Sequence, residues 1–108
     1  MYMEVVIVAT VIYNMLQEEK QRNLNMQKAY KQEIEGLRKG SIMIKTVSGK
    51  KYYYLRYRQG NKIKNDYIGK DESVVVEIKN EIEKRKYLQG VLKRLQTEYQ
   101  QISIIVKD

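Results

Sequence analysis

Two glycine-containing turn signals constrain what the middle of this chain can fold into. Ser-Gly at positions 48–49 and Gln-Gly-Asn at positions 59–61 are typical of the loops that close β-hairpins. The runs beside them are rich in β-branched and aromatic residues, which favour strands. The pattern therefore predicts a three-stranded antiparallel meander with strands at Ser41–Val47, Lys50–Arg58 and Lys62–Ile68.

Side-chain alternation predicts a register for both hairpins. A two-residue turn in the first hairpin pairs Ile44 with Tyr53. A three-residue loop in the second hairpin pairs Tyr57 with Ile63 and Tyr53 with Tyr67. A slip of one residue in either hairpin would mix the two faces of the sheet. The apolar face expected from this register contains Ile42, Ile44, Tyr53, Leu55, Tyr57, Ile63 and Tyr67.

The other face of the predicted meander is basic. In the expected register Arg58 lies opposite Lys62, and Arg56 lies opposite Lys64. Like charges directly across a ladder are destabilising, so an anion that bridges them would relieve the repulsion. The members expected on this face are Met43, Lys45, Val47, Tyr52, Tyr54, Arg56, Arg58, Lys62, Lys64, Asp66 and Ile68.

Helical patterns flank the meander on both sides. Apolar residues recur at helical spacings between Met3 and Arg38, and Gly40 is expected at the C′ position after this helix. A second helix is predicted from Asp71 onward, with Asp71 or Ser73 as its N-cap. The chain has no proline, which suits long uninterrupted helices.

The N-terminal apolar run is ambiguous in its secondary structure. Residues 4–13 are rich in valine and isoleucine, so the segment is open between a helix and a buried strand. As a helix, Val5 to Tyr13 would span about 14 Å, against roughly 30 Å of hydrocarbon in a bilayer. We therefore expect no membrane association, and a role for this run in the core or in a dimer contact.

The expected architecture is an α+β fold in a single domain covering residues 1–108. Residues 1–40 are predicted to be helical, 41–70 to form the basic meander, and 71–108 to be helical. Two helices of this length cannot both lie wholly on so small a sheet. Much of their apolar surface should therefore pack helix on helix, either as a hairpin within the chain or across a homodimer.

Net charge is concentrated in the meander. Residues 41–70 carry eight Lys or Arg and one Asp, which accounts for +7 of the chain's +8, and they hold five of its ten tyrosines. A basic element with interleaved aromatics indicates an anionic partner. The hypothesis is nucleic acid, with DNA favoured over RNA. The candidate binding residues are Lys45, Tyr52, Tyr54, Arg56, Arg58, Lys62 and Lys64.

The composition excludes several kinds of chemistry. Histidine and cysteine are both absent, so a Ser-His-Asp triad, a thiolate metal site and a disulfide are excluded. The carboxylates lack the spacing of a calcium loop, and no phosphate-loop motif is present. We therefore expect a non-enzymatic accessory or regulatory protein of the bacterial cytoplasm, with no catalytic residue, no metal and no cofactor.

Two other functions stay open. In the first, the helices recruit a protein partner or a second copy, and the basic sheet keeps the protein in solution. In the second, the chain is a metal-independent RNase similar to RelE-like toxins, which work with Tyr, Arg, Lys and Glu on a basic sheet. If residues 4–13 formed a strand, the order strand–helix–meander–helix would loosely match that fold.

The middle of the chain resembles known groups of proteins. The block KGSI…GKKYYYLRYRQGNKIKNDYIGKD, from Lys39 to Asp71, is similar to small uncharacterised proteins of Gram-positive bacteria that have a helix, a YYYL-type meander and a charged helix. The meander is also similar to the N-terminal sheets of some bacterial transposases. Residues 41–85 resemble the arm-type DNA-binding domains of tyrosine recombinases. That resemblance implies that the sheet face with Arg56, Arg58, Lys62 and Lys64 enters a major groove.

Overall fold

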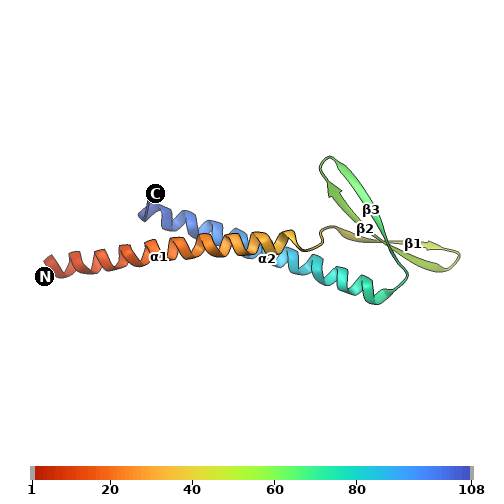
Figure 1. The fold of residues 1–108 in the computed structure, drawn as a ribbon, viewed down its shortest axis with the longest axis horizontal. Coiled ribbons are helices and arrows are strands. Elements are labelled where there is room, and N and C mark those ends of the chain that lie inside the picture. Colours follow the sequence, from red (N-terminus) through yellow and green to blue (C-terminus); the bar gives the residue numbers. More distant parts are fainter. Residues whose placement is uncertain (1, 108) are drawn as a thin grey trace. The chain divides into compact units, whose positions relative to one another are not determined.

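The computed structural model describes residues 2–107, which fold as a helix, three strands and a second helix (Figure 1). The elements are α1 (Tyr2–Glu35), β1 (Ser41–Val47), β2 (Lys50–Gln59), β3 (Lys62–Gly69) and α2 (Glu72–Ile105), and the strands form an antiparallel sheet in the order β1-β2-β3. The predicted α+β helix–meander–helix fold is confirmed. Helix α1 runs without a break through residues 4–13, so the strand alternative for that segment is wrong, and the element order of RelE-like toxins is not present.

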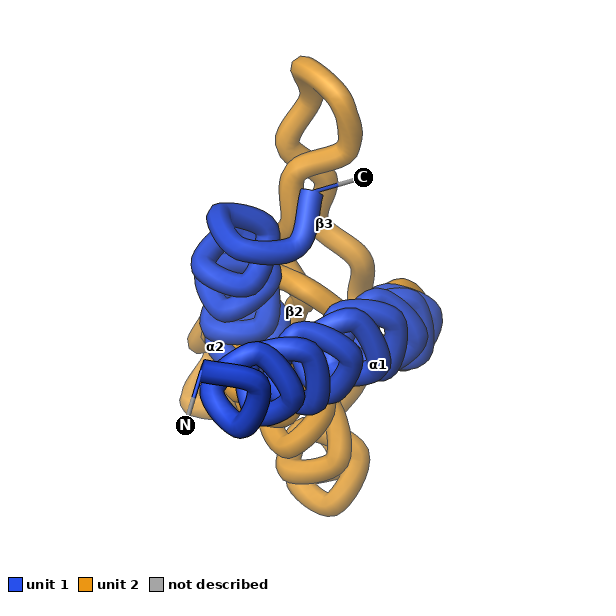
Figure 2. Tube along the Cα trace, turned by 90° about the vertical axis from the view of Figure 1, so that its left-hand side faces the viewer, with its two compact units in different colours: residues 1–33, 89–108 blue, residues 34–88 orange. Residues whose placement is uncertain are grey.

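Two compact units make up the chain (Figure 2). The helical unit comprises residues 1–33 and 89–108, and the sheet unit comprises residues 34–88. Neither of the described helices has a stretch sufficiently long and apolar to cross a membrane.

In the helical unit, α1 packs on the C-terminal part of α2 through a seam with a polar centre. Asn23 is only 2% exposed, and its Nδ2 donates a hydrogen bond to the Leu95 carbonyl oxygen at 2.9 Å. The Asn23 Oδ1 accepts from Nε2 of Gln27, also buried, at 2.7 Å. This polar seam cannot be recognised from the sequence, because amide side chains at helical spacing are typical of a solvated face.

Lys20 belongs to the same seam and is buried as a charged side chain. Its Nζ donates to the Val106 carbonyl oxygen at 2.8 Å and lies 5.2 Å from the centroid of the Tyr99 ring. Burial of an ammonium group is tolerated when hydrogen-bond acceptors and a π face replace its water. The covered positions Leu16, Lys20, Asn23 and Gln27 are four, three and four residues apart, which is the spacing of a coiled-coil seam.

The polar seam predicts an asymmetry between two sets of substitutions. Asn23→Ala should lower the free energy of unfolding by about 1–3 kcal/mol, because the buried Gln27 amide loses its acceptor. The double substitution Asn23→Leu with Gln27→Leu should cost less, since no polar group is left unpaired. Urea denaturation measures the free energy of unfolding of both variants. A double variant that is less stable than the single variant would contradict this prediction.

The core of the sheet unit lies on one face of the meander. Leu55, in the middle of β2, packs against Ile78 and Ile82 of α2, and all three are buried. Each such side chain contributes about 1.5–3 kcal/mol when it is removed from water. The cluster is completed by partly buried Ile42, Tyr57, Ile68 and Val74. The face of the sheet that carries Leu55 is therefore the inner face, and the opposite one is the outer face.

The end of α1 is fixed by an arginine from α2. Arg85 Nη1 donates to the carbonyl oxygens of Ile34 at 2.6 Å and Leu37 at 2.8 Å, so it satisfies acceptors that a helix end leaves free. The helix stops at Glu35, and the predicted placement of Gly40 at its C′ position is wrong. Gly40 instead has a φ of +121° at the entry to β1, where a Cβ would overlap the Arg56 carbonyl oxygen.

The first hairpin has the predicted register. Ile44 pairs with Tyr53 and Ile42 with Leu55. The two turn residues, Ser48 and Gly49, have φ values of 51° and 78°. Positive φ at both central positions is the conformation of the type I′ turn, whose twist matches that of the flanking strands.

The second hairpin differs from the prediction by one residue. Its turn contains only Gly60 and Asn61, so Gln59 pairs with Lys62 and Arg58 with Ile63. Gly60 has a φ of 60°, and a glycine at the first central position suits a two-residue turn. The predicted three-residue loop, the pairing of Tyr57 with Ile63 and that of Tyr53 with Tyr67 are therefore wrong.

The shift exchanges the two faces of β3. Ile63 and Tyr67 lie on the outer face, where they are 51% and 57% exposed, and Lys62, Lys64 and Asp66 lie on the inner face. Because Tyr54 pairs with Tyr67 whereas Tyr53 pairs with Gly69, β3 carries one extra residue at a bulge. That residue, Ile68, packs against the core and also leaves the predicted outer face.

Helix α2 begins with an aspartate cap. Asp71 Oδ1 accepts hydrogen bonds from the Ser73 hydroxyl at 2.7 Å and from the Ser73 backbone N–H at 2.9 Å. Of the two N-cap candidates, Asp71 therefore has this role. The bonds from the Ser73 hydroxyl and from its backbone N–H favour the ionised carboxylate and hold the pKa of Asp71 below its ordinary value of 3.8.

The cap predicts a pH-dependent stability. Asp71→Ala should lower the Tm by a few degrees, whereas Asp71→Asn should keep the cap at neutral pH. A depressed folded-state pKa gives stability that is present above the ordinary pKa and is lost as pH falls through the folded one. The wild type should therefore lose stability relative to Asp71→Asn between about pH 5 and about pH 2. Thermal unfolding followed by circular dichroism checks this, and a pH-independent difference would contradict it.

Candidate nucleic-acid interface

The outer face of the sheet is basic and carries no carboxylate. Alternation along the paired strands defines its members as Ser41, Met43, Lys45 and Val47 of β1, Lys50, Tyr52, Tyr54, Arg56 and Arg58 of β2, and Ile63, Asn65 and Tyr67 of β3. The one acidic residue of the three strands, Asp66, lies on the inner face. The cations of the outer face therefore have no neutralising partner on their own face.

Lysines cover two of the outer tyrosines. Lys45 Nζ lies 4.7 Å from the centroid of the Tyr54 ring, and Lys70 Nζ lies 5.0 Å from that of Tyr52. Such cation–π contacts place each ammonium group over a ring. They also leave Tyr52 and Tyr54 only partly exposed, so both rings serve first as supports for lysines.

Tyr67 extends the aromatic row across to β3. Its ring centroid lies 5.3 Å from that of Tyr54, with the planes tilted by 55°. At 57% exposed, Tyr67 has free ring surface that could stack on a base. Tyr67 was not among the predicted binding residues, because the predicted three-residue loop placed it on the apolar face. A two-residue turn at Gly60-Asn61 would have identified it.

Arg56 and Arg58 are exposed on the outer face of β2. Arg56 pairs with Ser41 on one side and Asn65 on the other, and Arg58 pairs with Ile63. Neither guanidinium takes part in an ion pair with another described residue. Both are available to an external anion.

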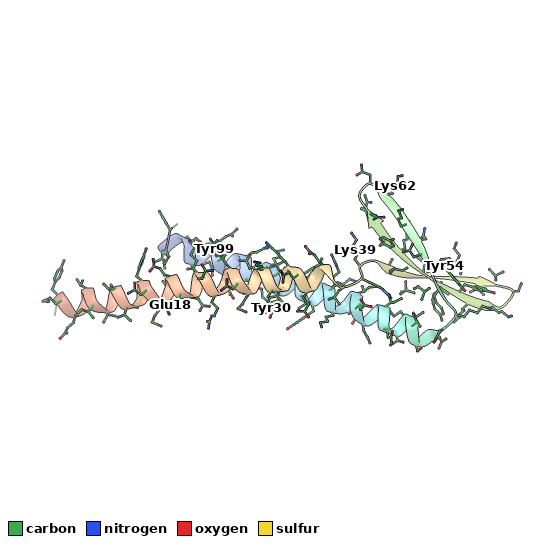
Figure 3. All side chains as sticks on the ribbon, in the orientation of Figure 1. Glu18, Tyr30, Lys39, Tyr54, Lys62 and Tyr99 are labelled. Carbon is green, nitrogen blue, oxygen red and sulfur yellow. The ribbon has the colours of Figure 1, made fainter. Side chains whose placement is uncertain are left out.

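Lys62 and Lys64 are not part of this surface. They lie on the inner face, and Figure 3 labels Lys62 at the tip of the β2–β3 hairpin and Tyr54 in the body of the sheet. The expected pairs of facing cations are therefore absent, so these arginines and lysines do not repel one another across the ladder. The structure brings Lys45, Tyr52, Tyr54, Arg56 and Arg58 together as predicted, and it adds Lys50, Lys70 and Tyr67.

The inner face of the second hairpin has its own polar contact. Hydrogen bonding with the Asp66 carboxylate, followed by desolvation and the charge of that carboxylate, raises the pKa of Tyr57. Asp66 thus lies beside Tyr57 on the inner face, away from the outer cations.

The sheet unit also has an open hollow of about 430 Å³. Arg85 and Arg38 line it together with Glu35 and Asp66, so charges of both signs are mixed there. Arg85 is engaged with the end of α1. No group of three or more potential metal ligands occurs among the described residues. The hollow lacks the single-sign charge of the outer face.

Comparison with known proteins places the chain in a family. The family described as "Domain of unknown function (DUF6788)" matches residues 15–80, a segment that includes the whole sheet and its outer face. No curated protein and no solved structure matches the chain. Because the match covers more than half of the sequence, the chain belongs to the DUF6788 family, whose domain has no known function.

Proposed function

We propose that this protein is a non-enzymatic nucleic-acid-binding accessory or regulatory protein that holds its partner on the outer face of the sheet. The observation that carries the proposal is the segregation of charge. Lys45, Lys50, Arg56 and Arg58 share a face without a carboxylate, and Lys70 reaches the same face over Tyr52. A surface that carries only positive charges attracts a polyanion, and the affinity depends strongly on salt concentration.

The residues of the outer face would have different roles in binding. Arg56 and Arg58 have free guanidinium groups for phosphates or base edges. Lys45 and Lys70 are held by their tyrosine rings and contribute fixed positive charge. Tyr67 offers the exposed ring for stacking.

Duplex DNA is the partner that we favour. The major groove, about 12 Å wide, admits a two-stranded β-ribbon, and hairpin β2–β3 is such a ribbon beyond Arg56, where β2 pairs with β3 alone. The similarity to arm-type domains of tyrosine recombinases points the same way. The corrected register changes the residues that would enter the groove, since Lys62 and Lys64 leave the set and Tyr67 joins it.

Two double substitutions of equal charge test the assignment to the outer face. Arg56→Ala with Arg58→Ala removes two cations from the outer face, and Lys62→Ala with Lys64→Ala removes two from the inner face of the same hairpin. The first should weaken duplex binding about tenfold or more and reduce the slope of log K against log salt by about 2, because about two phosphate contacts are lost. The second should change affinity less than about twofold.

Fluorescence anisotropy of labelled duplex DNA at several salt concentrations measures both effects. Equal losses in the two variants would contradict the outer-face assignment and indicate unspecific attraction to net charge. No binding by the wild type at low salt would contradict the proposed function itself.

Tyr67 gives a separate prediction for single strands. Tyr67→Ala should weaken binding of single-stranded DNA or RNA about tenfold, because one base loses its stacking partner. Tyr87→Ala is the matched control, since Tyr87 is 67% exposed on α2 and lies outside the sheet. Anisotropy with labelled oligonucleotides compares them, and an equal effect of the two substitutions would contradict a stacking role for Tyr67.

A second function, protein–protein interaction through the helices, is favoured by one observation. The first four turns of α1 expose many apolar side chains, among them Met3, Val5 and Ile7 at 75%, 68% and 60%. This surface is chemically unlike the basic sheet, so the two roles are compatible in one chain.

A further inference from the structure

The N-terminal segment of α1, residues 2–15, has no cover within the described chain. Helix α2 ends beside Lys20, as the hydrogen bond from Lys20 Nζ to Val106 shows, and the N-terminal segment extends past that point (Figure 1). Its large apolar side chains are 40–84% exposed: Tyr2, Met3, Val5, Val6, Ile7, Val8, Val11, Ile12, Tyr13 and Met15.

The chemistry of this segment indicates a buried helix. Glu4 is its one charged residue, and apolar side chains occur all round it. A helix that is apolar all round is normally buried, and an exposed apolar surface of this kind marks an interaction site.

A lipid surface fits the segment poorly. Helices that lie in a membrane interface combine an apolar face with a polar face rich in Lys and Arg. Residues 2–15 contain neither Lys nor Arg, and the first cation of the chain is Lys20, which is buried in the seam with α2.

The spacing of the seam between α1 and α2 continues into the N-terminal segment. The covered positions of α1 from Leu16 to Gln27 follow a spacing of four and three, and the same spacing carried toward the N-terminus reaches Tyr2, Val6, Ala9 and Tyr13. Of these positions, Tyr13 and Val6 are 40% and 49% exposed, and Tyr2, at the start of the helix, is 84% exposed. The seam positions therefore continue along α1 past the end of α2, over about 14 residues, or about 21 Å, that no other part of the described chain covers.

We infer that a second copy of this chain covers this segment, with the N-terminal segments of the two copies packed antiparallel. The segment is nearly uncharged and self-complementary, as a two-fold interface requires. An antiparallel partner runs along α1 in the same direction as α2 does, so it continues the existing seam. It also separates the two Glu4 carboxylates and opposes the two helix dipoles, whereas a parallel pair would bring both together.

Disulfide mapping tests the orientation, and it starts from a chain without cysteine. In the antiparallel pair Tyr2 of one copy lies near Tyr13 of the other. Mixed Tyr2→Cys and Tyr13→Cys chains should therefore form a crosslinked heterodimer under mild oxidation. Neither variant alone should crosslink, because its two thiols lie about 16 Å apart, beyond the 4.4–6.8 Å Cα separation of disulfides. Self-crosslinking of Tyr2→Cys would overturn the antiparallel arrangement.

Sedimentation equilibrium tests the dimer itself. The wild type should show a concentration-dependent dimer, and Val6→Glu should shift the dissociation constant upward about tenfold or more, because a carboxylate would be buried in the interface. The control is Ile104→Glu, at a side chain 74% exposed on α2, which should leave the equilibrium unchanged.

Two results would overturn the inference. A wild type that stays monomeric at every concentration excludes the second copy. A monomer that also co-sediments with vesicles of phosphatidylcholine and phosphatidylglycerol, and loses this binding in Val6→Glu, would assign the segment to a lipid surface. Both results leave the nucleic-acid experiments unaffected, since those depend on the sheet.

Discussion

The packing of Leu55 against Ile78 and Ile82 decides which face of the meander is available for binding. Once this cluster forms, alternation along β2 sends Arg56 and Arg58 to the opposite side. The cluster therefore determines which face of the sheet carries the arginines, although its own residues lie on the other face. The apolar core of the sheet unit lies on the inner face, so the outer face carries its charge outside that core.

The two units differ in how their helices are held. In the sheet unit α2 is fixed by apolar burial and by the bonds from Arg85 to the end of α1. In the helical unit the centre of the seam is hydrogen bonded through Asn23 and Gln27. Polar groups inside a helical seam specify register because a shifted arrangement leaves them unpaired. Apolar contacts thus supply stability in one unit, and directional bonds supply alignment in the other.

The sequence predicted the fold well and the candidate site in part, and the misses have physical causes. Long Pro-free helical patterns and two glycine turns were sufficient for the order of elements and for the first register. The second register was wrong because grouping Ile63 and Tyr67 with the apolar face outweighed the turn preference of Gly60. The polar seam was missed because Lys20, Asn23 and Gln27 become recognisable as seam residues only when α2 is seen against them.

Gly40 links the connection between α1 and β1 to the behaviour of Arg56. The backbone at Gly40 approaches the Arg56 carbonyl so closely that no side chain fits between them, and the next residue, Ser41, pairs with Arg56 in the sheet. The main chain of Arg56 is therefore held in place by Gly40 and Ser41, while its side chain is exposed to solvent. Because its backbone is already ordered, Arg56 loses only side-chain rotamers when it binds an anion. Its binding therefore costs less conformational entropy than that of an arginine on a flexible loop. Gly40 thus limits the backbone freedom of Arg56.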